Sequence, residues 1–175
     1  MTEQLLLILP TAEHETEIAA YKEEFLTNGD SMDGTAGLKS ALSVTEWIKQ
    51  IALNEREETV QPGFVPSSTY LAIHAQTGRL VGMIDIRHRL NDHLLFTGGH
   101  IGYSVRKSER RKGYAKEMLR QALLLCRKEL NLTRCLVTCN SENIASSRTI
   151  EANGGVLENM VADGADMVKR YWIAL

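Results

Sequence analysis

The segment Ile101-Gly102-Tyr103-Ser104-Val105 is followed closely by the run Arg110-Arg111-Lys112-Gly113-Tyr114-Ala115, and together they predict a strand, a basic turn and the start of a helix. Backbone N–H groups at a helix N-terminus have no partner within the helix, and the aligned peptide dipoles place partial positive charge there, so anions bind readily. The three cations of the run add side-chain charge, and Gly113, which lacks a Cβ, allows close approach of a phosphate. The segment therefore predicts a cradle for a diphosphate.

The helix predicted after this turn has one apolar face and one charged face. Its apolar residues recur at helical spacing and are Ala115, Met118, Leu119, Ala122, Leu123, Cys126 and Leu130. The opposite side carries Lys116, Glu117, Arg120, Gln121, Arg127 and Lys128. We therefore expect one face to pack on the core and the other to meet solvent.

Length and composition indicate an ordinary globular protein. With 175 residues the chain can bury a core without disulfides or metal ions, so we expect a single domain over residues 1–175. Its formal net charge of −2 argues against a protein that coats nucleic acid, although a local basic cluster can still bind a small anion. Cys126, Cys135 and Cys139 are odd in number and lie in apolar segments, which indicates buried thiols in a reducing compartment and no zinc site.

The N-terminal region carries no targeting signal that the sequence reveals. Residues Met1 to Gln4 lack the positive charge of a signal peptide, and the apolar run Leu5 to Leu9 is too short to span a membrane. We therefore expect a soluble cytoplasmic protein that has no membrane partner.

The remaining pattern predicts an α+β fold. The run Leu5 to Leu9, closed by Pro10, predicts a strand buried on both faces. One helix is expected after Thr11, and a second begins at Ser43, where Glu46 completes a capping box. Further strands are expected over residues 69–75, 80–89, 98–105, 135–139, 156–161 and 168–173. In this order, antiparallel strands meet a parallel crossover through the long helix.

Two motifs resemble those of a known family. The pattern Arg-x-x-Gly-x-Ala, formed by Arg110, Gly113 and Ala115 after a strand that ends in valine, resembles the acetyl-CoA signature Gln/Arg-x-x-Gly-x-Gly/Ala of the GNAT acyltransferase superfamily. The segment Asn143 to Gly155 is similar to that family's second helix, which begins with Asn and ends in a Gly turn. Within the superfamily, the chain looks like a bacterial group of acetyltransferases with a Gly-Gly-His-Ile-Gly-Tyr-Ser-Val strand, here Gly98 to Val105.

The resemblance implies an α/β sandwich whose mixed, splayed, predominantly antiparallel sheet has about seven strands flanked by helices. In this fold the fourth and fifth strands diverge, and the pantetheine arm of acetyl-CoA lies in the gap. The implied acetyl-CoA-binding residues are Tyr103, Ser104, Val105, Arg110, Arg111, Lys112, Gly113, Tyr114, Ala115, Asn143 and Ser147. Tyr103 and Tyr114 could instead be packing residues, and Asn143 could simply cap its own helix.

The implied activity is the direct transfer of the acetyl group of acetyl-CoA to a primary amine of a small-molecule acceptor, which the sequence does not identify. A non-catalytic acyl-CoA-binding module is the alternative, because Ile150 stands where the family often has a proton-donating tyrosine. A nucleotide kinase and a dinucleotide oxidoreductase are excluded, since neither Gly-x-x-x-x-Gly-Lys-Ser/Thr nor Gly-x-Gly-x-x-Gly occurs. The terminal hairpin offers a strand edge that could pair in a homodimer.

Two residues are candidates for the general base that deprotonates the amine. His100 carries an imidazole, which titrates near neutrality, but it could equally be a hydrogen-bonded histidine at the start of a buried strand. Asp85 lies on the neighbouring strand, where a carboxylate usually needs a partner, and Arg87 on the same face could be that partner. The cluster Arg87-His88-Arg89 is either a site for a substrate carboxylate or phosphate, or a solvated strand end.

Overall fold

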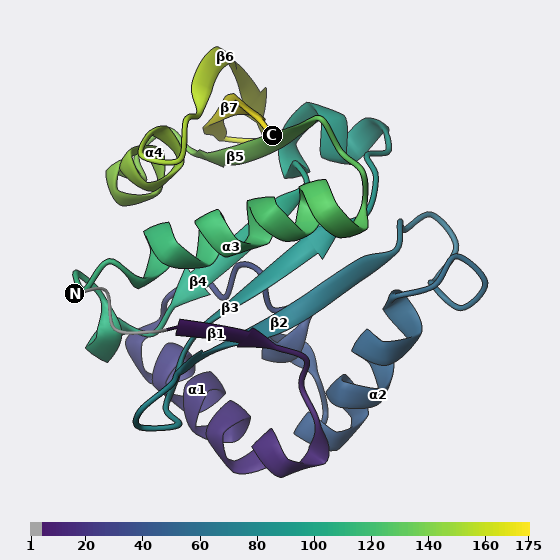
Figure 1. Cartoon of the computed structure of the whole chain (residues 1–175), viewed down its shortest axis with the longest axis vertical. Coiled ribbons are helices and arrows are strands. Elements are labelled where there is room, and N and C mark those ends of the chain that lie inside the picture. Colours follow the sequence, from purple (N-terminus) through teal and green to yellow (C-terminus); the bar gives the residue numbers. More distant parts are fainter. Residues whose placement is uncertain (1–4) are drawn as a thin grey trace.

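The computed structural model describes residues 5–175, and within them seven strands form one mixed sheet (Figure 1). The strands are β1 (Leu5–Ile8), β2 (Ser67–His74), β3 (Leu80–Arg87), β4 (Ile101–Val105), β5 (Arg134–Asn140), β6 (Val156–Asp163) and β7 (Asp166–Ala174). Their order is β1-β2-β3-β4-β5-β7-β6, in which β4 and β5 are parallel and all other neighbours are antiparallel. The predicted mixed, mainly antiparallel sheet is confirmed.

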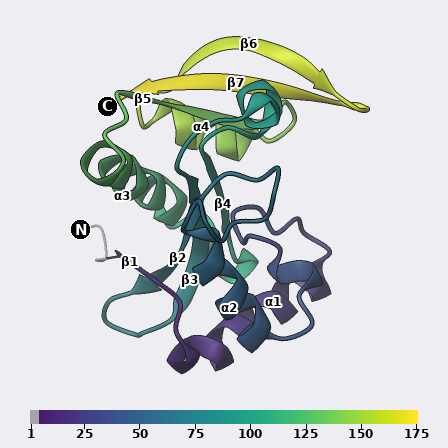
Figure 2. The ribbon, with the colours of Figure 1, turned by 90° about the vertical axis from the view of Figure 1, so that its right-hand side faces the viewer.

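The α-helices of the described residues cover both faces of the sheet (Figures 1 and 2). They are α1 (Glu15–Asn28), α2 (Val44–Asn54), α3 (Tyr114–Glu129) and α4 (Ile144–Glu151). Helices α1 and α2 bury their apolar side chains against β2 and β3 on one face, whereas α3 and α4 share a second core with the opposite face. The sheet is therefore the middle layer of a three-layer arrangement.

The long helix α3 packs as its periodicity predicts. Met118, Leu119, Ala122 and Cys126 are fully buried against the sheet. Burial of a side chain such as Met or Leu stabilises the fold by about 1.5–3 kcal/mol, so this apolar face holds α3 firmly and fixes the position of its N-terminus.

Helix α2 begins where its cap predicts and is tied to the loop before it. The Ser43 hydroxyl accepts a hydrogen bond from the backbone N–H of Glu46 at 3.1 Å. The Trp47 indole donates to the carbonyl of Thr35 at 2.8 Å, and both residues are buried. Loop and helix therefore form one wall over the β2–β3 face.

Strands β4 and β5 separate almost as soon as they meet. They pair only at Ile101 and Val137, whereas β4 pairs with β3 along its whole length and β5 pairs with β7 along its whole length. The edge of β4 that faces β5 is therefore left unpaired beyond Ile101, which is the divergence that the family resemblance implied.

Two details differ from the sequence-based predictions, and one further prediction falls on residues that the structure does not describe. Strand β1 is not buried on both faces, because it lies at the edge of the sheet and Leu6 is 43% exposed. The strand expected from Gly98 begins at Ile101, because residues Leu94–Gly98 form one π-helical turn. Residues 1–4, on which the argument against a signal peptide rests, lie outside the described part of the chain. Within residues 5–175, no helix has the length and apolar character needed to cross a bilayer.

Candidate active site

A cleft of about 860 Å³ opens where β4 and β5 separate, and it extends to the N-terminus of α3. Its walls include three parts that the sequence analysis expected to meet: the edge of β4, the turn at residues 110–113 and the first turn of α4. The loop that contains Asp30, Asp33 and Gly34 forms a further wall that was not expected. A glycine-rich loop after a helix carries no pattern that reveals which strand it covers.

The turn before α3 has the geometry of an anion-binding nest. Arg111 and Gly113 both adopt left-handed backbone angles, with φ of 65° and 84°. Gly113 is the N-cap of α3, and a Cβ added there would meet no atom within 4 Å. Left-handed residues in a turn that leads into a helix N-terminus are typical of backbone anion-binding nests.

The three cations of the turn have different surroundings. Arg110 donates from Nε to the carbonyl of Val105 at 2.9 Å and pairs with Asp30 at 2.9 Å, so it braces the turn. Lys112 pairs with Glu109 at 2.7 Å. Arg111 is exposed and has no partner among residues 5–175. Its guanidinium is therefore the cation of this turn that is available to a ligand.

The side chains of β4 point to opposite faces of the sheet. The Tyr103 hydroxyl lies 2.8 Å from the hydroxyl of Ser146 in α4, and burial raises the pKa of Tyr103 to about 12. Ser104 faces α1, where its hydroxyl lies 2.9 Å from that of Tyr21 and burial raises the pKa of Tyr21. Ser104 and Val105 are buried, and their backbone carbonyls accept hydrogen bonds from the Tyr21 hydroxyl and from Arg110 Nε, respectively.

The first turn of α4 presents one of its two serines to the cleft. The Asn143 side chain accepts from the N–H of Ser146 at 3.0 Å, so it caps the helix while it also lines the cleft. Ser146 lines the cleft too, whereas Ser147 lies under the helix with its hydroxyl 3.4 Å from the Cys139 thiol. Ile150 is fully buried in the core.

The two remaining residues of the turn lie at the cleft in different ways. Tyr114 is buried, and its ring makes an edge contact with the ring of His74. Ala115 is half-buried on the same wall. Tyr114 therefore packs chiefly on the core while it borders the cleft.

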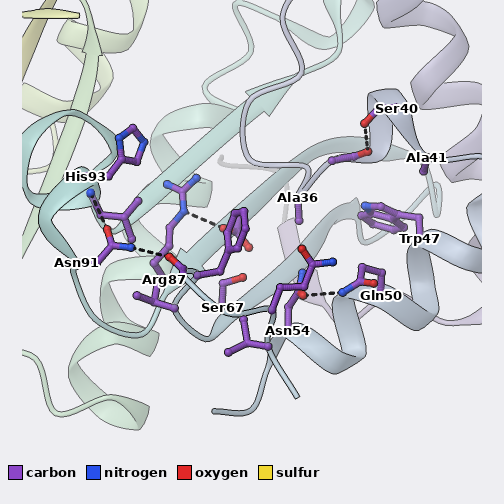
Figure 3. Close-up of a pocket in the computed structure, with 18 of the residues that line it drawn as sticks. Ala36, Ser40, Ala41, Trp47, Gln50, Asn54, Ser67, Arg87, Asn91 and His93 are labelled. Carbon is purple, nitrogen blue, oxygen red and sulfur yellow. Dashed lines mark hydrogen bonds and ion pairs between the residues drawn. The ribbon is translucent and has the colours of Figure 1, made fainter. Parts of the chain in front are cut away.

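A second cavity, of about 1040 Å³, lies between α2, the ends of β2 and β3, and the loops around Ala36, Phe64 and Asn91 (Figure 3). The Asn91 side chain joins two of these loops, since it donates to the carbonyl of Gly63 at 3.2 Å and accepts from the N–H of Leu94 at 2.9 Å. His93 lines this cavity and has no hydrogen-bond or ionic partner within residues 5–175. A histidine in an irregular loop has no distinguishing sequence pattern, so His93 was not among the predicted site residues.

Asp85 and Arg87 lie on the walls of these cavities. Asp85 lines the second cavity, and Arg87 is the one residue of the described chain that lines both. Asp85 Oδ2 and Arg87 Nε form an ion pair at 3.0 Å, and Asp85 Oδ1 accepts from the hydroxyl of Thr69 at 2.9 Å. The predicted ion pair between Asp85 and Arg87 is therefore present.

His100 lines neither cavity. It is 5% exposed, and its Nδ1 accepts the backbone N–H of Leu136 at 2.9 Å. Burial, and then the charge of Arg87, lower the pKa of His100 to about 4. These contacts are those of a neutral histidine that joins β4 to β5.

The basic cluster after Asp85 divides between different surroundings. Arg87 reaches the cavities, whereas the His88 ring lies 2.8 Å from the Ser68 hydroxyl, and Arg89 pairs with Glu57 at 2.6 Å. Burial lowers the pKa of His88. Within residues 5–175, no three His, Cys, Asp or Glu side chains are grouped as metal ligands would be.

The family model described as an acetyltransferase (GNAT) domain matches residues 4–156. The chain belongs to this family. It is accordingly an acetyl-CoA-dependent acyltransferase, with acetyl-CoA as its cosubstrate. Among curated proteins, none matches the chain.

Several solved structures share the GNAT fold. The microcin C7 self-immunity acetyltransferase MccE, in complex with acetyl-CoA and AMP, is 16% identical with a TM-score of 0.73, over 99% of this chain and 93% of that one. A spermidine N-acetyltransferase SpeG chimera from Vibrio cholerae and hSSAT is 17% identical with a TM-score of 0.67, over 98% and 95% of the two chains. A GNAT-family acetyltransferase from Bacillus anthracis is 21% identical with a TM-score of 0.64, over 99% and 96%. These likenesses extend over almost the whole chain and establish the fold.

Proposed function

We propose that this GNAT enzyme passes the acetyl group of acetyl-CoA directly to a primary amine of a small-molecule acceptor. The observation that carries the proposal is that Arg87 lines both cavities, one of which is the cleft between β4 and β5, and we call the position of Arg87 the junction. A thioester in the cleft and an amine in the second cavity would come together at this junction. Direct transfer needs no nucleophilic side chain of the enzyme.

In this proposal the cleft contacts acetyl-CoA at two places, the diphosphate and the pantetheine arm. The diphosphate would lie on the nest formed by Arg111, Lys112 and Gly113, next to the free guanidinium of Arg111. The pantetheine arm would use the backbone edge from Tyr103 to Val105, which has no strand partner on the side of β5. Asn143 would contact it from α4, and Arg110 would brace the turn through Val105.

The chemistry forms a C–N bond and breaks the thioester C–S bond, so the amine must lose a proton and the thiolate must leave. Of the two candidate bases, Asp85 is the better placed, because it lines the amine cavity while His100 lines neither cavity. We propose that Asp85 receives the proton through a water molecule. His100 remains the alternative base, and variants of the two residues distinguish them.

The second candidate function is that of a non-catalytic acyl-CoA-binding module. The observation that favours it is Ile150, a fully buried aliphatic side chain where the family often has the tyrosine that protonates the thiolate. On the described walls of the cleft, the phenols of Tyr103 and Tyr114 are the features of similar chemistry.

A two-part experiment tests the proposal. Calorimetric titration with acetyl-CoA measures binding, and release of free thiol during incubation with a panel of primary amines measures turnover. We expect micromolar binding and amine-dependent thiol release that Asp85→Asn reduces by about 10²-fold, the lower range for general base catalysis. Binding without turnover of any amine would favour the binding module.

We also propose a cytoplasmic location, one domain over residues 1–175 and a homodimer formed through β6. Strand β6 is the last strand of the sheet, and its residues Val156 and Met160 are 70% and 48% exposed. Such an open edge can pair with a second copy. Light scattering at several concentrations would test the dimer, which a mass of one chain throughout would contradict.

A further inference from the structure

The guanidinium of Arg87 is held at the junction with part of its hydrogen-bonding capacity unused. Nε pairs with Asp85 at 3.0 Å, and Nη1 donates to the carbonyl of Gly98 at 3.4 Å. Nη2 has no acceptor among residues 5–175, and the side chain is 25% exposed. Since a guanidinium carries five N–H donors, a ligand at the junction can accept from those that remain.

The position of this guanidinium is fixed from two sides. Asp85 is itself anchored by the hydroxyl of Thr69, and its side chain is only 5% exposed. On the other side, Nη1 and Nη2 lie 3.3 Å and 3.4 Å from the position that a Cβ on Gly102 would take. The guanidinium therefore lies against the backbone of β4, with no side chain between it and the strand that borders the cleft.

Arg87 is also the one permanent cation on the described walls of the second cavity. The carboxylates there are Asp85, which Arg87 already pairs, and Glu46, which is 63% exposed and pairs with Lys49 at 3.1 Å. A polyamine would need an excess of carboxylates, which these walls lack. The charges favour an acceptor that brings its own anion to Arg87.

We propose that the acceptor is an α-amino carboxylate, whose carboxylate binds the free N–H groups of Arg87 while its amino group lies on the side of Asp85. The inference rests on the proposed function, because it names the acceptor of that reaction. An adjacent negative and positive charge on one strand face complement the ammonium and carboxylate of an amino acid in its zwitterionic form. Guanidinium and carboxylate match in planar geometry, which makes such recognition selective.

The test compares amino acids with the amines that lack only the carboxylate. The pairs are phenylalanine and phenethylamine, tryptophan and tryptamine, histidine and histamine, and lysine and cadaverine. For at least one pair, we expect kcat/KM to be about 10- to 100-fold higher for the amino acid, because a hydrogen bond to a charged group contributes that much discrimination. Calorimetric titration of the same compounds in the presence of CoA measures the preference without relying on turnover.

Variants assign the preference to Arg87. Arg87→Lys keeps the charge but loses the planar donor pair, and we expect the preference for the carboxylate to fall about tenfold. Arg87→Met removes the charge, and we expect equal rates within each pair. Arg89→Met is the matched control, because Arg89 lies two residues away, pairs with Glu57 and lines neither cavity. It should keep the wild-type preference.

The outcomes separate this inference from the proposed function. Turnover of amines with no preference for the carboxylate would overturn the inference and leave the acetyltransferase function standing. Binding of amino acids over amines with CoA present, but without turnover, would support recognition of the carboxylate at Arg87, count against the function and overturn the amino acid as acceptor. Equal use of an amino acid and its amide, with both preferred over the amine, would overturn the inference in favour of a carbonyl ligand. Because Arg87→Met leaves Asp85 unpaired and can fail to fold, the wild-type comparison and Arg87→Lys decide the result.

Discussion

The backbone of Gly34 lies directly against the backbone of Gly102, with no side chain between them. The amide nitrogen of Gly34 is 3.3 Å from the position that a Cβ on Gly102 would take, and a Cβ on Gly34 would overlap the Gly102 carbonyl group. Gly34 also has a φ of 69°, in the left-handed region. The loop therefore closes onto β4 beside Arg87, at the junction of the two cavities.

Replacement of Gly34 by alanine should destabilise the protein and disturb this junction. The left-handed backbone alone costs about 1–3 kcal/mol in a non-glycine residue, and the collision with Gly102 should add a further 1–3 kcal/mol or so. Gly29→Ala is a matched control, because Gly29 has a φ of 68° and open space around its Cα. Urea unfolding of both variants measures the difference, and equal losses of stability would contradict the contact.

Replacement of Gly113 by valine should remove acetyl-CoA binding while the protein still folds. The branched side chain would stand over the nest, so we expect a loss of affinity of at least about tenfold, or about 1.4 kcal/mol. Gly154→Val serves as the control, because Gly154 has a φ of 86° against 84° for Gly113 and is also surrounded by open space. Both variants place valine at a nearly equal left-handed φ, and only Gly113→Val should lose binding by calorimetry. Normal binding would refute the position of the diphosphate.

The stability of the protein should fall between pH 6.5 and about 4 in a way that depends on His100. In the folded state burial holds the pKa of His100 at about 4, below the ordinary value of 6.5. As the pH falls through this window the unfolded chain takes up the proton first, so stability present above pH 6.5 is progressively lost. His100→Gln removes this component, so its urea midpoint should change less with pH in this range. Parallel curves for variant and wild type would contradict the buried, neutral histidine.

Tyr103 and Ser146 should be energetically coupled across the cleft. Their hydroxyl groups are 2.8 Å apart and join β4 to the first turn of α4. A double-mutant cycle with Tyr103→Phe and Ser146→Ala should give a coupling energy of about 0.5–1.5 kcal/mol, measured by urea unfolding. Additive losses would mean that the two hydroxyl groups do not interact.

The sequence predicted the parts of the site that depend on local chemistry. The nest before α3 follows from a glycine and a run of cations at the start of an amphipathic helix, and the ion pair of Asp85 with Arg87 follows from their spacing on one strand face. Both features are decided within a few residues of chain. For the same reason the cap at Ser43 appears where the sequence indicates it.

The features that the sequence did not reveal depend on contacts between distant segments. Gly34 meets Gly102 across a loop closure of some seventy residues, for which no periodic pattern exists. The choice of Ser146 over Ser147 depends on how α4 is rotated against the sheet. His100 was ambiguous because its partner, the N–H of Leu136, belongs to a strand far along the chain.

The separation of β4 from β5 after a single residue pair also bears on how the protein responds to its surroundings. Acetyl-CoA bound along this edge would act as an additional strand that joins two half-sheets, so local opening of the β5–β7–β6 half should become rarer as the ligand concentration rises. Ligand binding to the folded state alone stabilises it by RT ln(1 + [L]/Kd). The amide hydrogens of Tyr103 and Val105 would then exchange with solvent at a rate that reports the acetyl-CoA concentration around the enzyme.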